Sequence, residues 1–260
     1  MTIPLKRPFL EKLRTSYCKR QVRLRRRFAH MLGRDARTTR CRYYGVDFLV
    51  NIDDLIGYEI AIKRLDWREI KLMMDACERL RPDIFIDVGA NIGLYSCILG
   101  KHQLVPRILA FEPDRQNFSG LRANIQINEL SDIVDARPVA AGATVGTATL
   151  VPAGIGNRGL SKIGQDEANG YTVPIATLDD CLGLENRVIM IKIDVEDYEL
   201  EVLSGAHNLL RANTGFAQIE GRDDHMATMV TTKMESLGWR CRMGSVVTTA
   251  SPSPRIAPTT

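Results

Sequence analysis

Short apolar runs alternate along this chain with longer stretches in which apolar residues recur every three or four positions. The runs have the length of buried β-strands, and the longer stretches have the periodicity of helices that pack one face on a core. Strands that alternate with helices predict an α/β fold with a doubly wound, mostly parallel sheet and helices on both faces. Five runs are predicted to be strands, at residues 83–88, 107–112, 133–140, 187–195 and 216–220.

The helices and the remaining strands follow from the same pattern. Pro82 ends the first long helical stretch, and Pro113 and Asp114 open a later one, because these residue types favour helix boundaries. Residues 43–51 alternate between apolar and polar, which predicts a short hairpin or a single strand, and residues 239–248 predict one or two final strands. Helices are predicted at residues 59–80, 92–101, 114–128, 198–210 and 223–237, with a short one from Thr177.

Residues 142–176 interrupt this alternation with repeated glycines. Two short β-like pieces, at residues 147–151 and 171–175, lie within the segment. Glycine favours turns between short strands, so we predict an inserted β-hairpin with a mobile loop rather than a separate domain. Arg158 and Ser161 lie in that loop, which is either an ordinary flexible turn or a lid over a bound ligand.

The first 42 residues differ in charge from the rest of the chain. They contain 14 lysines and arginines and two acidic residues, which gives a net charge of +12, whereas the remainder carries −8. Residues 6–32 predict a basic amphipathic helix. We expect this helix to pack on the body, and an anionic membrane surface, a nucleic acid or an oligomer contact stays open as its partner. Its apolar stripe consists of Leu10, Leu13, Tyr17, Leu24, Phe28 and Met31.

Composition limits the class of protein. Of the 260 residues, 45% are hydrophobic and 25% are charged, as in ordinary globular proteins. No run of about 18 apolar residues and no apolar signal segment occurs, which predicts neither a transmembrane helix nor secretion. Six scattered cysteines without a C-x-x-C pair favour reduced thiols, so we predict a cytoplasmic protein, with peripheral membrane contact as an alternative. The predicted organisation is an arm at residues 1–42, one domain at 43–248 and a disordered tail at 249–260.

Acidic residues end the first two predicted strands. Asp87 precedes a turn with Gly89 and Gly93, whose lack of a Cβ we expect to let a ligand approach. Asn91 stands where a pyrophosphate-binding Gly-x-Gly-x-x-Gly turn has its middle glycine. Glu112 ends the second strand, where a carboxylate can accept both hydroxyls of a ribose. The turn and the Glu112 carboxylate together suit a ligand that has a ribose and no phosphates. This favours S-adenosylmethionine (SAM) over a dinucleotide as the ligand.

Three segments carry a combined signature. They are residues 87–93, residues 111–113 with Asn124 and Asn128 downstream, and residues 191–196 with Glu199 and residues 203–206. In this order and spacing the chain resembles the FkbM family of SAM-dependent methyltransferases over about residues 80–240. The resemblance implies a Rossmann-like class I methyltransferase core with a seven-stranded sheet. It also implies O-methylation of a hydroxyl on a carbohydrate, glycolipid or natural-product acceptor.

The resemblance and its two departures define the expected site. Asp197 and Tyr198 stand where the family has Gly-Ala, which reshapes the expected acceptor pocket. Val139 and Ala140 end the third strand without a polar group, so adenine contacts are expected to be apolar or to the backbone. Expected cofactor contacts are Asp87, Gly89, Ala90, Asn91, Gly93, Glu112, Pro113 and Asn117. Expected acceptor contacts are Arg158, Ser161, Lys192 and Tyr198.

Three residues are candidate catalytic bases: Asp194, Glu196 and His225. A sugar hydroxyl is a poor nucleophile, and a general base contributes about 10²–10⁴-fold to such reactions. Two structural alternatives stay open, since Asp194 could cap the next helix and Lys192 could only pair with a carboxylate. A divalent cation could in principle be bound by Asp179, Asp180, Asp194, Glu196 and His225, but no spacing demands it and no metal is predicted.

Other functions stay open beside the methyltransferase. A nucleic-acid methyltransferase would use the basic arm, although the chain lacks the Pro-Pro-aromatic tetrapeptide of adenine N-methylation and the Pro-Cys of cytosine C5 enzymes. A non-catalytic SAM-binding partner protein is disfavoured by the intact motifs. A nicotinamide oxidoreductase is disfavoured by the glycine turn.

Overall fold

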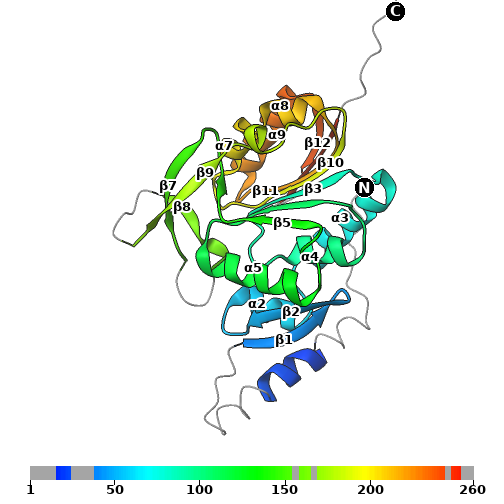
Figure 1. Cartoon of the computed structure of the whole chain (residues 1–260), viewed down its shortest axis with the longest axis vertical. Helices are drawn as coiled ribbons and strands as arrows, with labels where there is room; N and C mark the ends of the chain where they lie inside the picture. Colours follow the sequence, from blue (N-terminus) through cyan, green and yellow to red (C-terminus); the bar gives the residue numbers. More distant parts are fainter. Residues whose placement is uncertain (1–15, 25–37, 154–157, 165–168, 244–246, 253–260) are drawn as a thin grey trace, which may run out of the picture.

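The largest element of this computed structural model is a seven-stranded sheet (Figure 1). Five parallel strands lie in the order β5-β4-β3-β10-β11, and β13 and β12 add an antiparallel edge beside β11. The prediction of an α/β fold with a mostly parallel sheet is confirmed. The strands are β3 (Ile84–Val88), β4 (Ile108–Phe111), β5 (Val134–Arg137), β10 (Val188–Ile193), β11 (Thr214–Glu220), β12 (Trp239–Met243) and β13 (Val247–Pro252). The structure describes residues 16–24, 38–153, 158–164, 169–243 and 247–252.

The chain changes direction across the sheet between β3 and β10. It runs outward from β3 through β4 to β5, then returns to the other side of β3 and continues to β11. Side chains on β3 alternate between the faces: Phe85 joins one apolar cluster, and Ile84 and Ile86 join the other. Both faces are therefore buried, which explains the continuous apolar runs. The carboxyl ends of β3 and β10 form the switch point at which open α/β sheets bind ligands.

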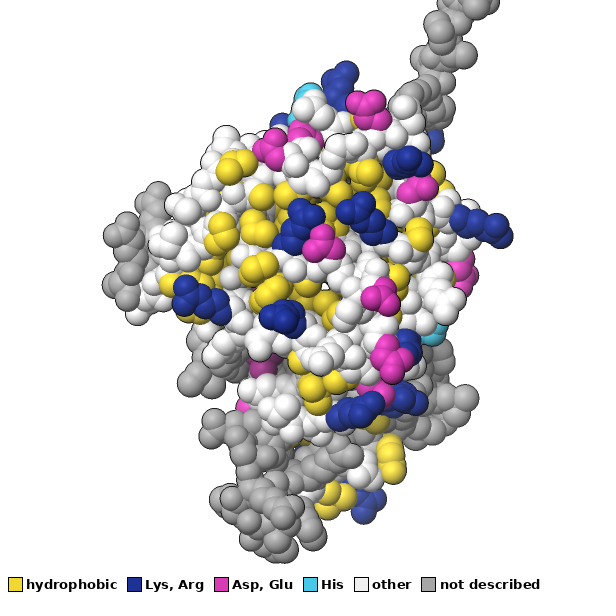
Figure 2. All heavy atoms as spheres, in the orientation of Figure 1, with side chains coloured by type: hydrophobic (Ala, Val, Ile, Leu, Met, Phe, Trp, Pro, Cys, Tyr) yellow, Lys and Arg dark blue, Asp and Glu magenta, His cyan; other side chains and the backbone are white. Residues whose placement is uncertain are grey.

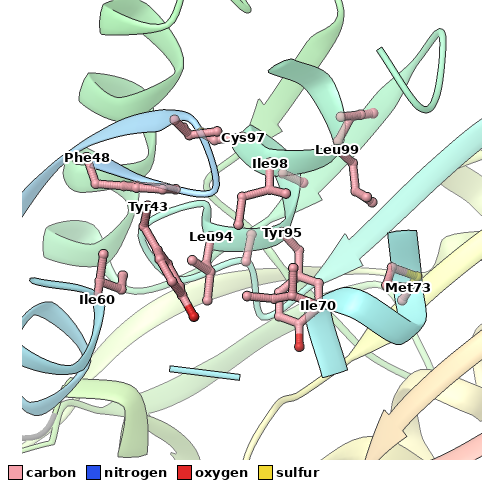
Figure 3. Packing of buried hydrophobic residues seen from close by; sticks show 14 of the residues in the cluster. Tyr43, Phe48, Ile60, Ile70, Met73, Leu94, Tyr95, Cys97, Ile98 and Leu99 are labelled. Atoms are coloured by element: carbon pink, nitrogen blue, oxygen red, sulfur yellow. The ribbon is translucent and has the colours of Figure 1, made fainter. Parts of the chain in front are cut away.

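Helices cover both faces of the sheet (Figure 1). Figure 3 shows the cluster on one face, where Ile70 and Met73 of α3 lie near Ile98 and Leu99 of α4. That face carries α3 (Trp67–Leu80), α4 (Leu94–Lys101) and α5 (Arg115–Ile127). The other carries α6 (Leu178–Cys181), α7 (Glu199–Ser204), α8 (His207–Ala212) and α9 (Asp224–Ser236).

A hairpin of β1 (Thr38–Tyr43) and β2 (Val46–Asn51) confirms one of the two predictions for residues 43–51. Two buried side-chain amides, one in α5 and one at the C-cap of that helix, hold it against the domain. Asn124 accepts the Leu49 N–H at 2.7 Å, and Asn128 donates to the Asp47 carbonyl at 2.7 Å. Asn124 and Asn128, which are part of the family signature, thus fix the hairpin rather than line the ligand site.

Two predicted helices are each divided in the structure. Residues 59–80 form α2 (Leu55–Ala61) and α3, separated by a turn in which Lys63 and Asp66 have left-handed backbones (φ 60° and 47°). Residues 198–210 form α7 and α8, which part at Gly205. A Cβ there would overlap the Gly142 carbonyl oxygen. The single-helix predictions were wrong because apolar periodicity continues through both turns and does not record the backbone reversal.

The glycine-punctuated insertion forms a second, four-stranded sheet in the order β6-β9-β7-β8. The predicted hairpin is confirmed as the antiparallel pair β7–β9, and β6 and β8 extend it. Its elements are β6 (Ala140–Ala141), β7 (Gly146–Val151), the 3₁₀ turn η1 (Arg158–Leu160), β8 (Lys162–Gly164) and β9 (Tyr171–Ala176). The predicted third strand was too long, because Ala140 and Ala141 pair with β9 instead of continuing β5.

The two ends of the chain are described only in part. Residues 16–24 are helical, and Val22 rather than the predicted Tyr17 or Leu24 packs on the core. Those two side chains are 64% and 50% exposed, so the predicted apolar stripe is wrong there. The other residues of the predicted arm helix lie outside the described ranges. β13 continues to Pro252, beyond the predicted end of the sheet, because it pairs with both β11 and β12.

Two surface properties bear on possible partners. On the face shown in Figure 2, basic and acidic side chains are interspersed and do not form one positive patch. Among the helices that the structure describes, none is long and apolar enough to span a membrane.

Candidate functional site

A cavity of about 230 Å³ opens at the carboxyl edge of the sheet, at the switch point. The ends of β3, β4, β10 and β11 form its floor, and Leu65 and Asp66 of the α2–α3 turn and Gly159 to Ser161 of the insertion form its sides. The structure brings most predicted site residues together here. They are Asp87, Gly89, Ala90, Asn91, Glu112, Pro113, Asn117, Ser161, Lys192, Asp194, Glu196 and Tyr198.

Three predicted site residues lie elsewhere or are described only in part. His225 is exposed in the first turn of α9 and does not line the cavity. Gly93 precedes α4 and lies behind the lining. The backbone of Arg158 belongs to η1, and its side chain lies outside the described part of the structure.

The glycines of the turn after β3 serve packing within the protein. Gly89 and Gly93 have φ values of 78° and 86°, which L side chains rarely adopt. A Cβ on Gly89 would overlap the Asp194 carbonyl oxygen, and one on Gly93 would lie 2.6 Å from a Leu121 methyl. The expectation that their missing Cβ atoms make room for a ligand was wrong, because protein atoms occupy both places.

Glu112 is held at the end of β4 by backbone amides on both sides. Its Oε2 accepts the Asn91 N–H at 2.7 Å, and its Oε1 accepts the Asp114 N–H at 2.8 Å. Burial raises the pKa of Glu112 to about 8, although those two N–H groups lower it. The carboxylate is therefore fixed in one orientation, with lone pairs left for a ligand.

Asp87 is almost fully buried at the end of β3. Its Oδ2 accepts from the Ser96 hydroxyl at 2.6 Å and from the Ser96 N–H at 3.2 Å. Its Oδ1 has no hydrogen-bond partner among the described residues. Burial raises the pKa of Asp87, while the Lys192 ammonium lowers it. A buried acceptor without a donor is costly, so a ligand donor in the cavity would be favoured at this oxygen.

Lys192 and Asp194 form an ion pair of 2.7 Å at the end of β10. The ammonium also lies 4.8 Å from the centre of the Tyr95 ring. Burial by itself lowers the Lys192 pKa, but the surrounding carboxylates, led by Asp194, raise it above its usual value. Lys192 thus pairs with a carboxylate, as one alternative expected, and it also lines the cavity, so the pairing does not exclude a contact with the acceptor. The alternative that Asp194 caps the next helix is wrong, because α7 begins at Glu199 without a side-chain cap.

Glu196 lies where β10 has given way to a tight turn. Glu196 and Asp197 have φ values of 51° and 73°, so they do not continue the strand. Burial raises the pKa of Glu196 to about 7, and the nearby Asp194, Glu199 and Asp197 carboxylates raise it further. No ion pair with a described residue engages Glu196, which leaves a carboxylate suited to take up a proton near neutral pH.

Sequence reasoning missed several polar residues of the site. The Tyr95 hydroxyl donates to Asp66 at 3.3 Å and accepts from the Gln218 amide at 3.2 Å. Glu220 ends β11 and lines the same cavity, and burial raises its pKa. Glu220 could have been predicted as a site residue from its position at the end of a strand, as Asp87 was. Asp66 offered no such signal because it lies inside a helix-like stretch.

The insertion meets the core beside Glu112. Ser161 donates to the second Asp114 carboxylate oxygen at 3.4 Å, and the Tyr171 hydroxyl lies 3.3 Å from the same atom. Because η1 also contacts α2, the insertion closes one side of the cavity. Val139 and Ala140 contribute apolar lining at this end, where adenine contacts were expected.

Asp179 and Asp180, two of the residues that could have bound a cation, have partners within the protein. Asp179 accepts the backbone N–H groups of Asn208 and Leu209 at the start of α8, and Asp180 accepts from Thr177. In the described ranges, no group of three or more His, Cys, Asp or Glu side chains is arranged to hold a metal ion.

Comparison with known sequences relates residues 87–240 to a domain described as "Methyltransferase FkbM domain". The hexuronic acid methyltransferase AglP of Haloferax volcanii is 28% identical over 145 residues, which cover 55% of this chain and 57% of AglP. This chain thus spans just over half the length of that relative. Methyltransferase 1 of Beauveria bassiana is 30% identical over 181 residues, which cover 59% of this chain and 72% of that protein.

A crystal structure of methyltransferase FkbM from Methylobacillus flagellatus superimposes with a TM-score of 0.49 at 16% identity. The match covers 65% of this chain and 43% of that one.

Proposed function

The chain belongs to the FkbM methyltransferase family, and we propose that it transfers a methyl group from SAM to a hydroxyl of a carbohydrate-type acceptor. One observation carries the proposal. A single cavity collects the Asp87 carboxylate from the end of β3, the Glu112 carboxylate from the end of β4 and the Glu196 carboxylate after β10. The first two suit a cofactor with an ammonium group and a ribose, and the third suits an acceptor that must lose a proton.

The residues present fit SAM. Glu112 would accept from the ribose hydroxyls, since its carboxylate keeps free lone pairs beside its two amide bonds. Asp87 Oδ1, a buried acceptor without a described donor, would accept from the methionine ammonium. Val139 and Ala140 would pack on the adenine, and Asn117 lies nearby in the same lining. When bound, SAM supplies a methyl group already activated by the sulfonium.

Glu196 is the proposed general base. It would take the proton of the acceptor hydroxyl as the new C–O bond forms. Its raised pKa of about 7 lets the carboxylate accept this proton near neutral pH. Asp194 suits the role less well, because its Oδ2 is already engaged by the Lys192 ammonium at 2.7 Å. Ser161 and Tyr198, which also line the cavity, are the proposed acceptor contacts.

The charge of the lining favours a hydroxyl over a carboxylate as the acceptor group. AglP is named for hexuronic acid, which supports a carbohydrate acceptor and offers both groups. Lining residues of the described cavity include six carboxylic acids and one lysine, and such a surface repels an anion but accepts hydrogen bonds from neutral hydroxyls. We therefore expect neutral sugars to be better acceptors than hexuronates.

The test is methyl transfer from isotopically labelled SAM to matched pairs of neutral hexosides and hexuronides. We expect label in the neutral member of a pair, and loss of that activity in Glu196→Gln. Glu78→Gln, an exposed substitution on the outer side of α3, is the matched control and should keep full activity. Labelling of RNA or DNA but of no carbohydrate would contradict the acceptor class and favour the nucleic-acid alternative.

A further inference from the structure

Two carboxylates of the cavity that the proposed function leaves without a role, Asp66 and Glu220, have no counter-ion in the described structure. Asp194 is paired with Lys192, but no described cation lies in an ion pair with Asp66 or Glu220. Both side chains line the cavity at the end formed by β10, β11 and the α2–α3 turn, away from Glu112.

Asp66 is held in place by a chain of hydrogen bonds that runs from β11 through α4 to the α2–α3 turn. The Gln218 amide donates to the Tyr95 hydroxyl, which donates to Asp66. Asp66 stands at the N-cap of α3 in a left-handed conformation, yet its side chain makes no cap hydrogen bond and turns to Tyr95 instead. It also precedes the segment matched by the family domain, so it is a feature of this chain's own N-terminal part.

Glu220 reaches the same place from β11. Lys192 and Gln218 are paired in the register of β10 and β11, so Glu220, two residues further, lies beyond the Lys192 ammonium at the strand ends. Burial raises the pKa of Glu220, as do the Asp194 and Asp66 carboxylates, and Lys192 lowers it. One lysine therefore faces several desolvated acids, and a further cation would relieve their repulsion.

We propose that Asp66 and Glu220 make this end of the site select the cationic sulfonium of SAM over its neutral coproduct, S-adenosylhomocysteine (SAH). The inference rests on the proposed function, which sets the methyl-bearing group beside Glu196. In the transfer the C–S bond breaks with its electron pair left on sulfur, the C–O bond forms, and Glu196 takes the hydroxyl proton. Sulfur is then neutral, so the attraction of Asp66 and Glu220 ends and release of the coproduct is favoured.

Calorimetric dissociation constants for SAM and SAH test this selectivity, measured at one ionic strength and at pH 8.5, above the raised pKa of about 8 of Glu220, so that its carboxylate is ionised. We expect the native protein to bind SAM about tenfold more tightly than SAH, which corresponds to about 1.4 kcal/mol. Glu220→Gln and Asp66→Asn should each weaken SAM severalfold and leave SAH within about twofold, since both substitutions remove charge and retain shape. Glu78→Gln, an exposed acid on α3, should leave the ratio unchanged.

Several outcomes would overturn the inference. The native protein could bind SAH as tightly as SAM or more tightly, or the variants could lose affinity for both ligands equally. Either result would show that the two carboxylates do not discriminate the ligands by the sulfonium charge. If Asp66→Asn does not fold, Glu220→Gln decides, because Glu220 makes no side-chain hydrogen bond to a described residue. Failure of the folded native protein to bind either ligand would instead contradict the proposed function.

Discussion

Glu112 combines two properties that rarely occur together: its carboxylate is buried and fixed by two backbone amides, and it still lines a cavity. Asp87 contributes the opposite arrangement, with one oxygen satisfied by Ser96 and the other without a described partner. Fixed acceptors of this kind lose little entropy when a ligand donor arrives. At the scale of single residues, SAM binding in this cavity therefore requires these carboxylates to be ionised and free to accept.

The affinity for SAH should depend on pH through Glu112. Burial raises the pKa of this carboxyl to about 8, and protonation would place a hydrogen where an amide or a ribose hydroxyl must donate. We expect SAH binding to strengthen as the pH rises through about 8 and to weaken below it. Titrations from pH 6.5 to 9 measure this, and Glu112→Gln should remove the pH dependence. Persistence of the same pH profile in the variant would assign it to another group.

The two acidic residues after β10 should have different kinetic roles. Glu196→Gln should lower kcat by about 10²–10⁴-fold with SAH affinity unchanged, because a general base acts only on the transition state. In the native enzyme kcat should fall as the pH drops below about 7, where Glu196 becomes protonated. Asp194→Asn should reduce kcat less and leave SAH affinity nearly intact. If Asp194→Asn abolishes cofactor binding, Asp194 belongs to the cofactor site.

At the scale of elements, some of the site residues lie on turns and not at the ends of strands. The left-handed α2–α3 turn brings Asp66 to the cavity, and the Glu196–Asp197 turn directs Glu196 there after β10 has ended. Sequence patterns identified the strands because both sides of a parallel sheet demand apolar residues. They missed these turns because no glycine or proline marks them, and tertiary contacts hold their left-handed backbones.

The hairpin should depend on one amide of α5. Asn124 is fully buried, accepts the Leu49 N–H and donates to the Ile92 carbonyl at 2.9 Å. Asn124→Ala leaves both groups unpaired, so we expect the free energy of unfolding to fall by about 2 kcal/mol or more. Denaturant titration measures the change, with exposed Asn208→Ala as the matched control. Equal stability of the two variants would mean that the amide does not hold the hairpin.

At the scale of the whole molecule, the sequence predicted the position of the site well. It did not predict which other segments of the chain enclose the site. Acidic ends on β3, β4 and β10 converge because parallel strands end at one edge of the sheet, and Asp87, Glu112 and Asp194 followed from that rule. The enclosing parts come from far along the chain. Asp66 enters from before the matched domain and Ser161 from the insertion. Their convergence depends on tertiary packing, which periodicity does not encode.

The most direct test of the central claim is calorimetric titration of the purified protein with SAH beside NADH. We expect SAH to bind with micromolar affinity and NADH not to bind. Glu112→Ala should weaken SAH binding by about 1–3 kcal/mol, because charged hydrogen-bond acceptors are lost. Binding of NADH without SAH, or SAH affinity unchanged in Glu112→Ala, would contradict the assignment of this cavity to SAM.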